Sequence, residues 1–142
     1  MDTVNTSLYA IPAAYLLAFV PHVINVSPRT TMDAVKGRMP AAAYEMAKRA
    51  DAAHQNGLES FSPFAIAMVV GNLSPTLSPT TLTLAATSYL AARALYTLVY
   101  IANTTPAVAA LRSSVWGISV ASWMVVLYKV AAGAVLAVPA AK

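Results

Sequence analysis

The sequence predicts an all-α integral membrane protein, a single domain built as a bundle of four membrane-spanning helices. Of its 142 residues, 58% are hydrophobic and 10% are charged, whereas soluble domains have roughly 45–50% apolar and about 25% charged residues. Residues 3–28 and 60–92 contain no Asp, Glu, Lys or Arg. A small soluble chain must keep much of its surface polar, so these stretches favour a bilayer.

The first span is predicted over residues 8–26. We expect a retained helix, because no basic segment precedes it and no cleavage pattern of small residues follows it. About 20 apolar residues cross the hydrocarbon of a bilayer, and this stretch has nearly that length. Pro12 and Pro21 lie within it and predict bends, which membrane helices tolerate when their neighbours satisfy the freed carbonyls.

The second span follows a polar connection of residues 27–52. Helix-forming residues start directly after Pro40, which suits the first turn of a helix because its missing N–H costs nothing there. We predict one long helix from about residue 41, outside the membrane at its start and embedded over residues 53–73. An uncharged turn with Pro75 and Pro79 ends it.

The third and fourth spans are predicted over residues 80–101 and 107–130. Five Lys and Arg residues lie at positions 29–51 and none lies in the turn at 75–79, which places the first connection in the cytoplasm. The expected location is therefore a multi-pass protein of the endoplasmic reticulum or microsomal membrane in a eukaryote, or of the inner membrane in a bacterium.

Several binding functions are disfavoured by the composition. The net charge is +4, but eight of the fourteen charged residues lie at positions 29–51, where five basic residues mix with three acidic ones. This is no basic stripe with interleaved aromatics, so no nucleic-acid partner is predicted. The sequence has no cysteine, and His22 and His54 have no partners at metal-ligand spacing, so no metal site is predicted either.

Charged residues inside the predicted spans identify a candidate site. Each costs roughly 2.5–3.5 kcal/mol to insert and so needs a partner or a function. Glu59, Arg93 and Arg112 lie in different spans, and Arg49 lies where the second helix enters the membrane. With the predicted topology all four fall toward the cytoplasmic side. Convergence from three helices predicts one polar cavity with surplus positive charge, which favours a small anionic ligand with carboxylates.

Helical spacing adds neighbours to these charges. Two sets of residues each share one helix face: Arg49, Asn56 and Glu59 in the second helix, and Arg93, Tyr96 and Tyr100 in the third. His54 points elsewhere and is either a site residue or a contact between helices or subunits. The alternative to a ligand site is a structural ion pair between Arg93 and Glu59, with the tyrosines as ordinary interface residues.

Residues 53–64 carry the pattern A-H-x-N-x-L-E-x-x-x-P-F, which closely resembles the signature of the MAPEG family, the membrane-associated proteins of eicosanoid and glutathione metabolism. Residues 93–100 look like the Arg/Tyr/Tyr face of the family's third helix. Residues 112–116 are similar to the basic start of its fourth helix. The resemblance extends over essentially the whole chain.

This resemblance implies a homotrimer with sites between subunits near the cytoplasmic face, where glutathione is the usual co-substrate and a lipophilic electrophile enters from the bilayer. Its ligand set would be Asn56, Glu59, Arg93, Tyr96 and Tyr100, joined by the candidates Arg49 and His54. Arg112 would lie beside the sulfur and lower the pKa of the thiol, because a cation favours the thiolate. Arg29 is the candidate for an arginine opposite the thiol.

Two other functions are compatible with the same fold. Ala52 stands where glutathione-using members commonly have a basic residue, and Arg49, one turn away, is the candidate to replace it. This difference favours a non-catalytic scaffold that binds a lipid and presents it to a partner enzyme. A glutathione-independent isomerase of a lipophilic metabolite, using Glu59, Tyr96 or Arg112 for acid–base chemistry, is the third hypothesis.

Overall fold

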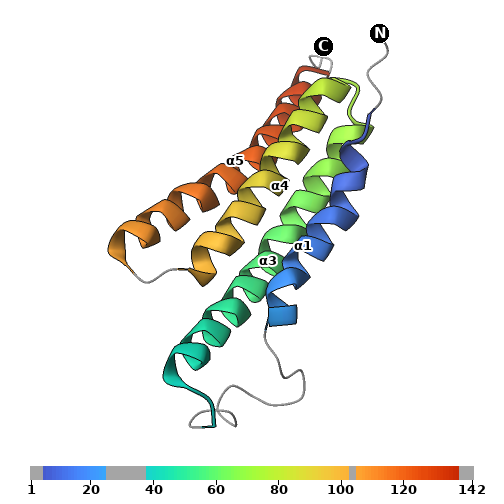
Figure 1. Ribbon diagram of the computed structural model, residues 1–142. Helices are drawn as coiled ribbons and strands as arrows, with labels where there is room; N and C mark the ends of the chain where they lie inside the picture. The colour runs from blue at the N-terminus through green and yellow to red at the C-terminus, as the bar shows by residue number, and fades with distance from the viewer. Residues whose placement is uncertain (1–4, 25–37, 103–104, 138–142) are drawn as a thin grey trace.

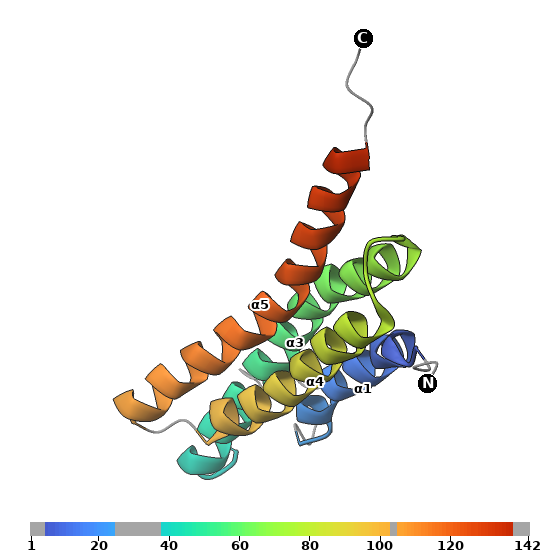
Figure 2. The same ribbon diagram turned by 90° about the horizontal axis from the view of Figure 1, so that it is seen from above.

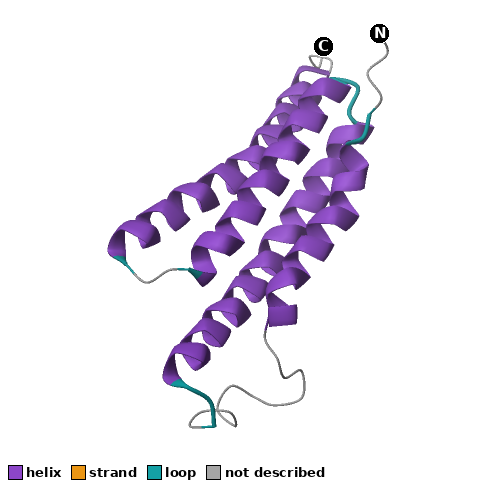
Figure 3. Ribbon diagram, in the orientation of Figure 1, coloured by secondary structure: helices purple, strands orange, loops and turns teal. Residues whose placement is uncertain are grey.

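The computed structural model describes residues 5–24, 38–102 and 105–137. These residues form a short 3-10 turn and four α-helices, and Figure 3 shows no strand among them. In chain order the elements are η1 (Ser7–Tyr9), α1 (Ala10–Ile24), α3 (Ala41–Leu73), α4 (Pro79–Ile101) and α5 (Pro106–Ala137). The predicted all-α fold is confirmed.

The ends of the helices follow from local sequence chemistry. α3 begins directly after Pro40, which is its N-cap residue rather than its first helical residue. α4 begins with Pro79 in its first turn, and the Ser78 hydroxyl accepts a hydrogen bond from the Thr81 N–H at 3.2 Å. Such a cap satisfies one of the free N–H groups of a helix start. The single long helix predicted from residue 41 to 73 is confirmed, whereas α5 continues past residue 130 to Ala137.

The four helices run alongside one another as a bundle (Figure 1). The start of α1, the end of α3, the start of α4 and the end of α5 lie at one end of it. α1 packs mainly on α3, and α4 mainly on α5. In Figure 2 the C-terminal half of α5 diverges from the other three helices. The two helix pairs therefore bring the end of α4 and the start of α5 to the same level of the bundle.

Small residues set the distance between α1 and α3. A Cβ atom added at Gly57 would lie 2.9 Å from the Cβ of Ala18, closer than such atoms approach in proteins. Packing of this kind is typical of helices in membranes, where small residues let backbones come close. The main core lies nearer the end of the bundle at which α1 and α4 begin. It is centred on Phe64, Met68 and Tyr89, and the Phe64 and Tyr89 ring centroids are 3.8 Å apart in a stacked arrangement.

Two described helices are long and apolar enough to cross a membrane, namely Pro79–Ile101 and Pro106–Ala134. A shorter apolar helix covers Ser7–Val23. α3 has 33 residues and is about 50 Å long at ~1.5 Å per residue, more than the ~30 Å of bilayer hydrocarbon. Its polar first turns therefore have length to extend beyond the hydrocarbon. The four-span topology, with its cytoplasmic connection, stays a prediction.

Candidate functional site

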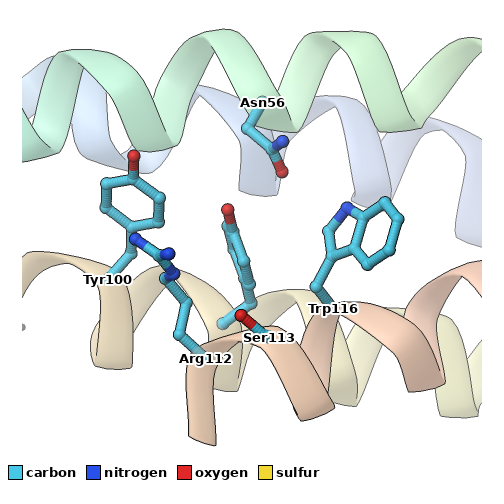
Figure 4. Close-up of a pocket in the computed structure, with 6 residues that line it drawn as sticks. Asn56, Tyr100, Arg112, Ser113 and Trp116 are labelled. Atoms are coloured by element: carbon cyan, nitrogen blue, oxygen red, sulfur yellow. The ribbon is translucent and has the colours of Figure 1, made fainter. Parts of the chain in front are cut away.

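A cavity of about 260 Å³ opens between α3, α4 and α5 (Figure 4). Its lining combines an amide, a guanidinium, hydroxyl groups and an indole, supplied by Asn56, Tyr96, Tyr100, Arg112, Ser113 and Trp116. Figure 4 shows Asn56 reaching in from α3 opposite the α5 residues, with Tyr100 and Arg112 toward one end and Trp116 toward the other. Residues far apart in the sequence therefore meet at one site.

Arg93 lies behind the wall of this cavity. Its side chain is only 4% exposed, and its Nη1 donates a hydrogen bond to Oδ1 of Asn56 at 3.0 Å. Its guanidinium carbon lies 4.4 Å from the ring centroid of Tyr96. Nη2 of Arg93 is buried and has no hydrogen-bond partner among the described residues. The guanidinium is thus held by an amide and an aromatic face, neither of which neutralises its charge.

Arg112 is the cation that faces the cavity itself. It is half-buried, and its guanidinium carbon lies 4.9 Å from the ring centroid of Tyr100. The Tyr96 and Tyr100 rings lie 5.4 Å apart. A cation over an aromatic face is stabilised by about 0.5–2 kcal/mol, depending on its desolvation. Two arginines from α4 and α5 are therefore linked through two tyrosines that line the cavity.

The electrostatic balance of the lining favours an anion. No carboxylate is among the described residues that line the cavity. A guanidinium presents several donors in a fixed fork that fits a carboxylate with two parallel hydrogen bonds. The amide of Asn56 and the hydroxyls can complete the coordination of a small polar ligand. Within the described residues no group of three or more His, Cys, Asp or Glu side chains is placed to hold a metal ion.

Among the other predicted site residues, Glu59 and Arg49 do not line this cavity, although the Glu59 carboxylate lies near enough to Tyr96 to interact with it electrostatically. Glu59 is exposed on the surface of α3. Arg49 donates a hydrogen bond from Nε to the Ile101 carbonyl at 2.9 Å and so satisfies a carbonyl at the C-terminal end of α4. Arg29 lies outside the described residues. The structure therefore brings together the predicted Asn56, Tyr96, Tyr100 and Arg112, with Arg93 directly behind them.

His54 lies in the contact between α1 and α3. Its Nδ1 is 2.8 Å from the Ala18 carbonyl, to which it can donate a hydrogen bond. Its ring centroid is 5.0 Å from that of His22 and 4.9 Å from that of Phe19. Of the two roles considered for His54, this geometry favours the helix–helix contact.

Two lining residues were not among the predicted site residues. Ser113 and Trp116 both lie on α5, and both line the cavity together with Arg112. The signal available in the sequence was helical spacing, because a residue four positions after Arg112 lies almost directly above it on the same helix. That spacing identifies Trp116 once Arg112 is placed in the site.

In a comparison with protein families, the model of the MAPEG family matches residues 6–132. The chain belongs to the MAPEG family. This confirms the resemblance seen in residues 53–64, and the match includes the segments that form η1, α1, α3 and α4 and most of α5. Comparisons with curated proteins and with solved structures gave no match. As a MAPEG protein the chain is a membrane-associated helical bundle with a role of the general kind related to glutathione or eicosanoids.

Proposed function

We propose that this MAPEG protein is a membrane-embedded, glutathione-dependent transferase or isomerase that acts on a lipophilic electrophile. One observation carries the proposal: Arg112 faces a cavity of about 260 Å³ whose described lining contains donors and no carboxylate. Such a chamber attracts an anion, and glutathione supplies two carboxylates together with a thiol. Asn56, Tyr96 and Tyr100 hold the tripeptide, and Arg93 adds positive charge from behind.

Arg112 performs the chemical role in this proposal. A guanidinium beside the glutathione sulfur lowers the pKa of the thiol, because it stabilises the thiolate more than the neutral form. The thiol proton leaves to water, and the sulfur electron pair forms a bond to an electrophilic carbon of the second substrate. Holding both substrates in one cavity supplies the favourable orientation. Ser113, the next residue on α5, also lines the cavity, where its hydroxyl donates to the Ala109 carbonyl at 3.2 Å and can accept a hydrogen bond from the ligand.

A second part of the proposal is the homotrimer, which Glu59 supports. This carboxylate is exposed on α3, within the segment predicted to be embedded. A charged group facing lipid is costly, so such groups normally face a protein or a water-filled surface. A neighbouring copy covering this face of α3 would remove Glu59 from lipid and bring its carboxylate to a site between subunits. Chemical crosslinking in native membranes tests the trimer directly.

The test of the proposed reaction compares two α5 cations. Purified protein in detergent or lipid is mixed with glutathione, and the ultraviolet absorbance of the thiolate is recorded together with product formation from an electrophile. Arg112→Ala should remove the thiolate signal and most of the activity, and Arg112→Lys should retain part of the signal. Lys129→Ala removes an exposed charge from the same helix, outside the cavity, and should leave both readouts unchanged.

The proposal fails if wild-type protein produces neither a thiolate signal nor a glutathione-dependent product. It also fails if Arg112→Ala retains both. Turnover of a lipophilic metabolite in glutathione-free membranes would instead support the isomerase hypothesis.

A second candidate function is the non-catalytic lipid-binding scaffold. It is favoured by a second pocket, of about 330 Å³, where the end of α3 and the following turn meet the C-terminal half of α5. Its lining is largely apolar and includes Val70, Leu73, Val130 and Ala134. Its volume is at the lower end of the range for small-molecule sites, about 300–1,000 Å³. Isothermal titration separates the two functions, since a scaffold binds a lipid without measurable affinity for glutathione.

A further inference from the structure

We infer that His22 and His54 form a binding site for a divalent transition-metal ion such as Zn²⁺, where the last turns of α1 contact α3. The two histidines are far apart in the sequence, so their spacing predicts no metal site, whereas the fold places their rings side by side. Neither histidine is among the described residues that line the cavity with Arg112. The inference is therefore independent of the proposed function.

The first support is the distance between the two imidazole rings. Their centroids are 5.0 Å apart and their planes are inclined at 39°. The rings are thus not stacked like those of Phe64 and Tyr89, whose centroids are 3.8 Å apart and whose planes differ by 3°. An imidazole nitrogen lies about 1 Å from the ring centre and a zinc–nitrogen bond is about 2.0–2.1 Å long, so two imidazoles on one tetrahedral zinc ion have centroids about 5 Å apart. The observed separation fits an ion held between the rings.

The second support is the hydrogen bond that His54 makes with its other nitrogen. Nδ1 of His54 lies 2.8 Å from the Ala18 carbonyl oxygen. A carbonyl can only accept, so Nδ1 carries the proton and Nε2 of the neutral ring has a free lone pair. Metal-binding histidines almost always donate their second ring N–H in this way, which fixes both the tautomer and the ring orientation. His54 is therefore already oriented as a ligand through Nε2.

The third support is access from water. His22 lies in the last turn of α1, and both histidines are half-buried, so an ion can reach them from the end of the bundle predicted to face the cytoplasm. Among the described residues no third ligand of the His, Cys, Asp or Glu type joins them. Water therefore completes the coordination, and the site is weaker and more exchangeable than a structural zinc site with four protein ligands. Asp51, one turn before His54 on α3, adds negative charge at the same level.

The ligand chemistry selects the class of ion. The 142 residues contain two histidines and no cysteine, so this pair is the one place where two imidazoles can meet within a chain. Imidazole suits zinc, copper and nickel, whereas magnesium and calcium prefer oxygen ligands. An ion bound here would fasten the end of α1 to α3, close to the contact of Ala18 with Gly57.

The binding test is calorimetric titration of Zn²⁺ into the untagged full-length protein, freed of metal with EDTA. Glutathione is left out, because its thiol would itself bind zinc. We expect saturable binding of one ion per chain that an excess of Mg²⁺ does not displace. His22→Asn and His54→Asn should each lower the affinity at least about tenfold, since even changes around a metal ligand cost 10–100-fold.

The substitutions are chosen to separate ligand loss from misfolding. The amide of His54→Asn can place an N–H near the position of Nδ1 and keep the bond to the Ala18 carbonyl, while it removes Nε2. His22→Asn leaves this hydrogen bond intact and gives an independent test, and circular dichroism checks that both variants are helical. Asp51→Asn is the matched control, because it removes a charge one turn away and should lower the affinity less than either histidine variant.

A second readout counts the ligands directly. Electron paramagnetic resonance of bound Cu²⁺ should show two nitrogen ligands in the wild type and one in each histidine variant. Zinc should also raise the midpoint of thermal unfolding of the wild type, because it binds the folded state, and should not do so in His54→Asn. The inference is overturned if zinc does not bind saturably, if both histidine variants bind it like the wild type, or if Asp51→Asn loses as much affinity as they do.

Discussion

Replacing Asn56 by alanine tests whether one amide holds the positive charge of the site in place. Oδ1 of Asn56 accepts the hydrogen bond from Nη1 of Arg93, whose other terminal nitrogen already has no partner among the described residues. The variant leaves the guanidinium buried with neither nitrogen bonded. A hydrogen bond to a charged group contributes about 1.5–3 kcal/mol. We expect the free energy of unfolding to fall by about that amount.

The measurement is unfolding by SDS in mixed micelles, followed by the helical circular dichroism. Gln55→Ala is the matched control, because Gln55 is the exposed neighbour of Asn56 and its only described bond is a 3.4 Å contact with Asp51. It should change stability by less than about 0.5 kcal/mol. If Asn56→Ala unfolds like the wild type, Arg93 does not depend on this amide and the reasoning is refuted.

Asn56→Asp separates stability from ligand recognition. The carboxylate still accepts a hydrogen bond from Arg93, so stability should fall less than with alanine. The added negative charge cancels part of the positive charge at the cavity, so the affinity for glutathione should fall. Calorimetric titration gives the affinity. Unchanged glutathione affinity would contradict the electrostatic account of the cavity.

Three further substitutions test the contacts that support the site. Gly57→Leu should lower the free energy of unfolding by about 1–3 kcal/mol, because the larger side chain overpacks against Ala18. Adding Ala18→Gly should recover part of this loss in SDS unfolding. No recovery would contradict the close approach of α1 and α3. Arg49→Met loses the hydrogen bond to the Ile101 carbonyl and should lower the free energy of unfolding by about 1.5–3 kcal/mol. The affinity for glutathione, measured by titration, should not change. Lost affinity with normal stability would instead show that Arg49 reaches the ligand. His54→Leu loses a 2.8 Å contact with the Ala18 carbonyl and should cost about 1 kcal/mol, again without a change in affinity; unchanged stability with weaker binding would favour a role in the site.

The starts of the helices could be predicted because they depend on residues within one turn of the helix end. Pro40, Ser78 with Pro79, and Pro106 mark where helices begin, and each acts on its own turn of backbone. The end of α5 has a signal that the predicted span did not use, since the sequence has a proline at position 139, two residues after Ala137. Its alanine-rich continuation after residue 130 has no break before Ala137, so the predicted span was shorter than the helix.

The site could be predicted only as far as helical spacing reaches. Spacing correctly placed Tyr96 and Tyr100 on one face of α4, and both line the cavity. It also placed Arg49 and Glu59 near Asn56, yet neither lines the cavity, since Arg49 bonds the Ile101 carbonyl and Glu59 is exposed on α3. A helix face covers a wide arc, and how α3 rotates within the bundle depends on the close approach of α1 at Gly57. The spacing of residues in the sequence does not predict how α3 is rotated about its own axis.

The choice of an amide at position 56 explains how the site can stay positive without being unstable. A carboxylate there would pair with Arg93 and neutralise it, whereas the amide satisfies one donor and leaves the charge. The aromatic faces of Tyr96 and Tyr100 stabilise the two guanidiniums in the same way, by attraction to a ring that carries no net charge. Glu59, the one acidic residue on this part of α3, is exposed and does not line the cavity, although it lies near enough to Tyr96 to interact with it electrostatically. The bundle therefore holds two cations close together with neutral partners, and an anionic ligand is the group that completes their electrostatic balance.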